Sequence, residues 1–174
     1  MRKILALIMA LVLLSFASTA LADAVKLTEN ASGFDLALEL PEGATVDVET
    51  YGDVPYTFIT YADETLPYIY ISVAPTEEYE GVTLATFTTE ELDVLFATVS
   101  ADLDNSSYQM KKTAKGYDYM LVEDNSETDA AVMVLIYEGY IIQMTVWNSD
   151  FDVLTDADTS TAEALLDTLQ IIEV

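Results

Sequence analysis

Residues 130–147 read AAVMVLIYEGYIIQMTVW, two strand-type runs on either side of Glu138-Gly139. Glycine readily takes the positive φ that tight hairpin turns need, so this pair predicts a turn between two antiparallel strands. The run Val132–Tyr137 is unbroken and largely aliphatic, which is typical of a central strand covered on both faces. The hairpin therefore predicts a sheet that lies between two other layers.

Further strands are expected on both sides of this hairpin. Phe34–Leu40 alternates apolar and polar residues, as a half-buried strand does, and Pro41-Glu42-Gly43 ends it with turn-forming residues. The other segments with strand-type composition are 46–48, 56–61, 68–73, 107–113, 117–123 and, as a short edge strand, Ile171-Ile172.

Two segments show helical spacing. From Thr88 onward, apolar residues recur along one helix face, and Thr88 with Glu91 has the spacing of a capping box. The apolar positions are Leu92, Leu95, Phe96, Val99 and Leu103. A second helix is expected to begin near Ser160, with Ser160 and Glu163 as its capping box. It would bury Leu165, Leu166 and Leu169.

The order of these elements predicts an α+β domain with a mainly antiparallel sheet flanked by helices. Over residues 32–174 it resembles the PsbP-like family, whose α/β/α sandwich occurs in photosystem extrinsic proteins and in many small exported bacterial proteins. The resemblance rests on the 34–43 opening, the 88–103 helix, Gly116-Tyr117, the 138–140 turn and the late helix. It implies a PsbP-like sandwich. Members of the family do unrelated things, including binding proteins and assisting photosystem assembly, so no site residue is transferred.

The first 22 residues have the three parts of a secretory signal peptide. Arg2 and Lys3 precede the apolar run Ile4–Ala17, and Ser18–Ala22 supplies small residues for cleavage after Ala22. The alternative is an uncleaved N-terminal anchor. Cleavage would leave residues 23–174 as one globular PsbP-like domain. We therefore expect an exported protein that is extracellular, periplasmic or associated with the cell surface.

The composition excludes several kinds of chemistry. The chain has 31 acidic and six basic residues, a net charge of −25, and neither Cys nor His. Such a charge disfavours nucleic acid and membrane-surface partners. Ser-His-Asp and Cys-His catalysis and ordinary zinc sites all need the missing residue types. We therefore predict a non-enzymatic protein; the alternative is a carboxylate-dependent hydrolase, which needs only a pair of acids.

Four aspartates are the candidate metal ligands: Asp150, Asp152, Asp156 and Asp158. Oxygen-rich loops suit calcium, but Thr161 and Asp167 stand where an EF-hand has Gly and Glu. The alternative is a solvated acidic loop that interacts favourably with the N-terminus of the second helix. No other cofactor is expected, and a low-affinity calcium-binding extracellular protein is the alternative function.

Six of the eleven tyrosines fall between positions 51 and 79, and four of them are the candidate ligand-binding residues: Tyr56, Tyr61, Tyr68 and Tyr70. Tyr68 and Tyr70 would point outward together if Ile69 and Ile71 face the core. Flat rings with a polar tip suit glycan or protein contacts. The alternative is that tyrosine merely covers half-buried sheet. Trp147 is expected to pack against a helix.

Lys111, Lys112 and Lys115 are half of the basic residues. We expect them to protect an edge strand or to balance neighbouring acids, the alternative being an acidic partner. Taken together, the sequence predicts an exported, non-enzymatic binding or accessory domain that acts on a protein or surface-polymer partner.

Overall fold

The computed structural model describes residues 24–26, 34–52, 54–101, 103, 105–124, 130–149 and 153–173. The predicted signal peptide lies outside these residues. A seven-stranded sheet, antiparallel throughout, has the order β3-β4-β5-β9-β8-β7-β6. Its strands are β3 (Ala44–Tyr51), β4 (Val54–Tyr61), β5 (Tyr68–Pro75), β6 (Ser106–Lys112), β7 (Asp118–Asp124), β8 (Ala130–Tyr137) and β9 (Tyr140–Trp147).

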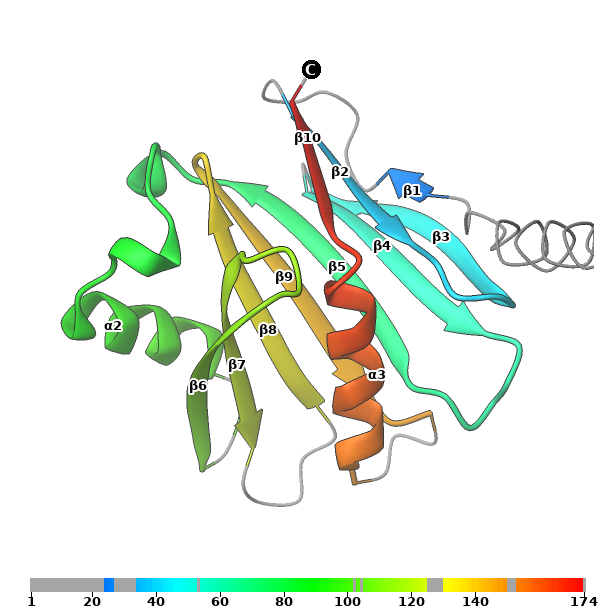
Figure 1. Ribbon diagram of the computed structural model, residues 1–174. Coiled ribbons are helices and arrows are strands. Elements are labelled where there is room, and N and C mark those ends of the chain that lie inside the picture. The colour runs from blue at the N-terminus through cyan, green and yellow to red at the C-terminus, as the bar shows by residue number, and fades with distance from the viewer. Residues whose placement is uncertain are drawn as a thin grey trace, which may run out of the picture.

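Two helices and a second, smaller sheet complete the described fold (Figure 1). The helices are α2 (Thr89–Val99) and α3 (Asp156–Leu166), and two 3-10 turns, η1 (Glu77–Tyr79) and η2 (Leu84–Thr86), precede α2. The small antiparallel sheet has the order β1-β2-β10. Its strands are β1 (Ala24–Lys26), β2 (Phe34–Glu39) and β10 (Gln170–Glu173). The prediction of an α+β fold with a mainly antiparallel sheet flanked by helices is confirmed.

The two helices lie on opposite faces of the large sheet. Side chains alternate between the faces of a strand, and β8 contributes Met133 and Leu135 to one core and Val132 and Val134 to the other. The first core lies under α3 and β2, so we call this the α3 face. The second lies under α2, η1 and η2, and we call this the α2 face. This gives the α/β/α layering that the family resemblance implied.

The α2 face is covered at one end only. The buried residues of its core come from η2, α2, β7 and β8, and the partly buried ones add Tyr108 of β6 and Ile141 of β9. No described residue of β3, β4 or β5 belongs to this core. In contrast, the core of the α3 face takes residues from six of the seven strands, from Val46 of β3 to Tyr119 of β7. Among the described residues, no helix therefore lies over the α2 face of β4 and β5.

The β8–β9 hairpin has the predicted turn. Glu138 and Gly139 both have positive φ, 45° and 78°, as a two-residue type I′ turn requires. The backbone of Gly139 also binds the loop after β5, since its carbonyl accepts from Thr76 N at 2.7 Å and its N–H donates to Tyr79 O at 3.1 Å. The turn thus fixes the loop that leads to α2.

The start of α3 differs from the prediction. The first capping box, Thr88 with Glu91, is confirmed at the start of α2. The second is wrong: α3 begins at Asp156, its N-cap is Thr155, and the reciprocal partner is Asp158 instead of Glu163. The shorter Asp side chain still reaches the N-cap amide, with Asp158 Oδ2 2.9 Å from Thr155 N. The N-cap therefore lies five residues before the predicted Ser160.

The small sheet joins the first described strands to the last. Ile171 pairs with Leu36 and Ile172 with Asp35, so the predicted late strand exists. Leu36 and Leu38 are fully buried in the core of the α3 face. Asp35 and Ala37, on the opposite side of β2, are also buried, so this strand is more enclosed than its alternating sequence predicted. No helix in the described part of the chain is long and apolar enough to cross a membrane.

Candidate functional site

Five aromatic side chains lie together on the uncovered part of the α2 face. We call this set the aromatic surface: Tyr56, Phe58, Tyr68, Tyr70 and Trp147. Tyr70 is central, with ring centroids 4.8 Å from Trp147, 5.8 Å from Tyr56 and 6.1 Å from Phe58. Tyr68 lies directly opposite Trp147 in the register and is 42% exposed. The rings therefore form one contiguous group across strands β4, β5 and β9.

The alternation of β5 places two of these rings. Ile69 and Ile71 are buried in the core of the α3 face, at 1% and 2% exposure. Tyr68 and Tyr70 consequently point to the other face, as predicted. The neighbouring strands bring Phe58 opposite Tyr70 on one side and Trp147 opposite Tyr68 on the other. Sheet pairing thus assembles rings that lie far apart in the sequence.

One of the four candidate tyrosines lies apart from the others, and the expectation for Trp147 is wrong. Tyr61 lies on the α3 face with Ile59, since both occupy odd positions of β4, and it packs against the α3-face core. Trp147 packs on the ring of Tyr70, on the face opposite α3. Phe58 and Trp147 were not among the candidate ligand residues, because their place in the cluster depends on the pairing of β4, β5 and β9.

Acidic side chains border the aromatic surface along strand β3. Asp47 lies opposite Phe58 and Glu49 opposite Tyr56 in the strand register, and both carboxylates are exposed. Ring faces with hydroxyl and indole N–H edges can cover the apolar surface of a partner and hydrogen-bond its polar groups. The adjacent acids favour partners that carry donors or positive charge on that side.

Tyr61 forms a wall of an apolar cavity on the α3 face, between the end of β2 and helix α3. Its hydroxyl oxygen is buried and makes no hydrogen bond. Burial without a partner raises the pKa of this hydroxyl above its ordinary value. The structure therefore separates the four candidate tyrosines into three on the aromatic surface and one beside this cavity.

The four candidate metal ligands cannot be assessed as a set, because Asp150 and Asp152 lie outside the described residues. Asp156 is exposed at the first position of α3. Asp158 is buried, and its Oδ2 accepts from the N–H and hydroxyl of Thr155 and from Asn148 Nδ2, at 2.9, 2.7 and 3.2 Å. Its carboxylate thus caps the helix, and calcium binding stays a prediction.

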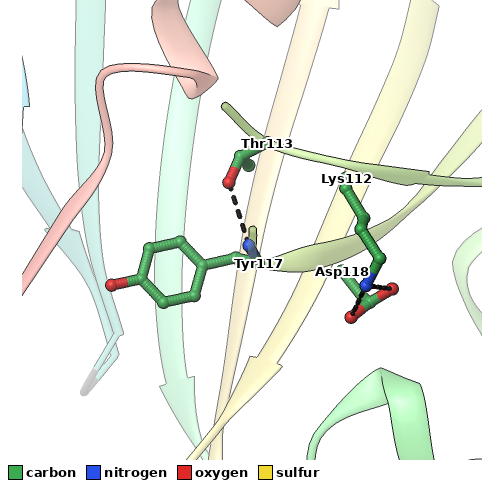
Figure 2. Close-up of polar contacts among 4 residues, drawn as sticks. All are labelled: Lys112, Thr113, Tyr117 and Asp118. Carbon is green, nitrogen blue, oxygen red and sulfur yellow. Dashed lines mark hydrogen bonds and ion pairs between the residues drawn. The ribbon is translucent and has the colours of Figure 1, made fainter. Parts of the chain in front are cut away.

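The clustered lysines contact acids and backbone at one edge of the large sheet. Strand β6 is the last strand of that sheet, and Lys112 Nζ lies 2.6 and 2.7 Å from the two carboxylate oxygens of Asp118 (Figure 2). In the same view, Tyr117 N donates to Thr113 Oγ1 in the turn between β6 and β7. Lys111 pairs with Glu163, and Lys115 Nζ donates to Thr168 O. Lys111 and Lys112 therefore balance acids as expected, and protection of the edge strand stays a prediction.

Glu163 of α3 accepts from two residues of the edge hairpin. Lys111 Nζ and Tyr119 OH donate to the same oxygen, at 2.5 and 2.7 Å. Partial burial opposes ionisation of Glu163, but these two hydrogen bonds and the charge of Lys111 outweigh it, so its pKa lies below the ordinary value. Burial, together with Glu163, moves the pKa of Tyr119 well above its ordinary value. A general acid needs the opposite, a carboxyl with a raised pKa.

Comparison with known proteins supports the fold. No protein-family model matches the chain, and no curated protein does so. The fold is of the PsbP-like α/β/α class. Among solved structures, the chain is similar to cyanobacterial PsbP (CyanoP) from Synechocystis sp. PCC 6803, with a TM-score of 0.52 and 14% sequence identity. The match covers 88% of this chain and 95% of that one.

Proposed function

We propose that this chain is an exported, non-enzymatic accessory domain that binds a protein or surface-polymer partner through the aromatic surface. The single observation that carries the proposal is the contiguous ring cluster around Tyr70, on the part of the sheet that no described helix covers. Export rests on the predicted signal peptide. The PsbP-like fold is compatible with such a role, since members of this family include binding and assembly proteins.

The geometry favours binding over a purely structural role for these rings. A sheet face that only needs cover can use threonine or valine, whereas here three tyrosines, a phenylalanine and the single tryptophan of the chain meet at one place. Tyrosine and tryptophan are enriched in binding surfaces, because they supply large contact areas at little cost in side-chain entropy. The acids of β3 add a polar border that contributes to selectivity.

The test compares the unmodified protein with the double variant Tyr68→Ser/Tyr70→Ser. Both proteins would be applied to glycan arrays and used to capture partners from the native cell envelope. We expect at least a tenfold loss of affinity in the double variant, since central aromatic residues dominate binding energy. Val94→Ser is the control, because Val94 is an exposed apolar residue on helix α2, away from the aromatic surface.

Thermal melting of each variant shows whether the fold is intact. The proposal is wrong if the double variant binds every captured partner and glycan as tightly as the unmodified protein. Turnover of a substrate by the purified protein would also contradict it.

A further inference from the structure

A cavity lies beside Tyr61, on the α3 face, and is separate from the aromatic surface on the opposite face of the sheet. It has a volume of about 520 Å³, within the range of small-molecule pockets. Three segments enclose it: the residues that end β2, the last residue of β4, and one face of α3. Its apolar walls are Leu40, Pro41, Tyr61, Ala164 and Leu165. Both Pro41 and Ala164 are exposed, so the cavity opens to solvent.

Two of the hydroxyl groups at the cavity, those of Thr161 and Thr168, already bond the protein's own backbone. Thr161 Oγ1 donates to Ala157 O at 2.8 Å, and Thr168 Oγ1 donates to Leu165 O at 2.7 Å. Thr168 Oγ1 also accepts from Glu39 N at 3.0 Å. Because these groups satisfy the backbone of α3 and β2, the two threonines present mainly their methyl groups to the cavity. The cavity is therefore more apolar than its sequence indicates.

One charged side chain, Glu39, occurs among the described residues that line the cavity. One of its oxygens, Oε1, accepts from Gln170 Nε2 at 2.8 Å, and the carboxylate faces no described lysine or arginine there. Lys115 contacts the nearby carbonyl of Thr168 but does not line the cavity. A bound anion would meet a negatively charged residue in the cavity wall and would also meet the net charge of −25.

From this combination we infer that the cavity between β2, Tyr61 and α3 binds an uncharged apolar small molecule, such as a long-chain alcohol, and discriminates against anionic chains. Such a molecule would bury its apolar body against Leu40, Ala164 and Leu165. Glu39 acts as the selectivity residue, because it repels the head group of a fatty acid and tolerates a hydroxyl.

The test uses the neutral fluorophore N-phenyl-1-naphthylamine as the probe. Titration into the purified protein is expected to give saturable fluorescence with one site. Dodecanol is expected to displace the probe at least fivefold more effectively than dodecanoate. Glu39→Gln should bring the two competitors to within about twofold of each other, since it removes the repulsion between like charges at short range.

Ala164→Trp would fill the cavity from α3 and is expected to weaken probe binding at least tenfold. Ala97→Trp is the matched control, because Ala97 is an exposed alanine on the other helix. If the melting curve shows that Ala164→Trp does not fold, Thr161→Phe is used instead. Thr161 lines the same cavity from the preceding turn of α3. Unchanged probe binding in the folded cavity-filling variant would overturn the inference.

Two further outcomes would also overturn it. One is the absence of saturable binding by the unmodified protein. The other is a concentration-dependent dimer in sedimentation velocity that Ala164→Trp abolishes, because the cavity would then be occupied by a second copy of this chain. Preferential displacement by dodecanoate in the unmodified protein would contradict the assignment of Glu39.

Discussion

The hydroxyl of Tyr119 donates a hydrogen bond to Glu163 over 2.7 Å and so joins strand β7 to helix α3. Lys111 of β6 donates to the same carboxylate oxygen. Asp167, just after α3, extends the connection, since its Oδ1 accepts from Ala114 N at 2.7 Å. The helix that forms one wall of the cavity is therefore attached to the edge hairpin through its acidic side chains.

Glu163→Gln is expected to lower the free energy of unfolding by about 1–2 kcal/mol at pH 7, because hydrogen bonds to a charged group contribute about that much. The folded-state pKa of Glu163 lies below its ordinary value of 4.5. The stability that the Glu163 carboxylate contributes is therefore complete at pH values above its pKa in the unfolded chain. This stability is lost as the pH falls through the lower pKa of Glu163 in the folded protein. Urea unfolding at pH 7 and pH 3, followed by Trp147 fluorescence, measures this.

The control for Glu163 is Glu90→Gln, which changes an exposed acid on α2. We expect a change of less than about 0.5 kcal/mol for it, as for most surface substitutions. A difference between Glu163→Gln and the unmodified protein that is equally large at both pH values would show that the charge of Glu163 is not what stabilises this contact.

Asp158→Ala is expected to destabilise the protein by about 1–2 kcal/mol in the presence of EDTA, because it removes half of the capping box of α3. Asp156→Ala changes an exposed acid two residues earlier and should cost no more than about 0.5 kcal/mol. Chemical unfolding of both variants gives these values. Equal effects would mean that the capping contacts of Asp158 add nothing to stability.

The same contrast sharpens the calcium test. A melting-temperature change in Asp158→Asn reflects the helix cap whether or not calcium binds, so that variant alone is uninformative. Asp156→Asn leaves the cap intact. If these acids bind calcium, calorimetry at millimolar calcium should show heat in the unmodified protein that Asp156→Asn reduces. No heat and no shift in melting temperature would end the calcium hypothesis.

Tyr61→Phe is expected to leave stability unchanged or to raise it by up to about 1 kcal/mol, because the substitution removes a buried hydroxyl that has no hydrogen-bond partner. Tyr119→Phe is the contrasting change, since its hydroxyl bonds Glu163, and it should destabilise by about 1 kcal/mol. Thermal and urea unfolding of the two variants test this. Destabilisation by Tyr61→Phe would show that the hydroxyl of Tyr61 does have a partner in solution.

Gly139→Ala should destabilise the protein more than Gly81→Ala. Both glycines have positive φ, 78° and 70°, which costs alanine about 1 kcal/mol or more at either position. A Cβ on Gly139 would also lie 3.3 Å from Thr76 O, whereas one on Gly81 would meet nothing within 4 Å. We expect a difference of about 1 kcal/mol in unfolding free energy. Equal losses of unfolding free energy in the two variants would mean that the loop at Thr76 moves away from the new Cβ without loss of stability.

The local sequence pattern was sufficient to predict strand β8 and the start of helix α2. Val132–Tyr137 indicated strand β8 because its side chains are apolar toward both cores, and Thr88 with Glu91 marked the start of α2. The start of α3 differs from the pattern because aspartate takes the reciprocal position of its capping box, where glutamate or glutamine is usual. Thr155 and Asp158 have the required spacing, and the structure shows that the shorter carboxylate suffices.

The aromatic surface was only partly predictable. Tyr68 and Tyr70 alternate with Ile69 and Ile71 along one strand, and this alternation was enough to place the two tyrosine rings on the face opposite the isoleucines. The same alternation separates Tyr56 from Tyr61, because two residues that are five positions apart on one strand point to opposite faces. The contacts of Tyr70 with Phe58 and Trp147 depend on which strands pair and in which register. Strand β9 follows β5 by more than 60 residues, and no local pattern specifies that pairing.

The pairing of β2 with β10 has a consequence for how the protein folds during its synthesis. Leu36 meets Ile171, and Thr168 bonds the backbone of Glu39, across more than 120 residues. The small sheet that closes the α3 face therefore cannot form until residues 170–173 have left the ribosome. Because α3 immediately precedes β10, the cavity wall also forms late. The α3 face consequently stays incompletely folded until residues 156–173 are available to pair and pack.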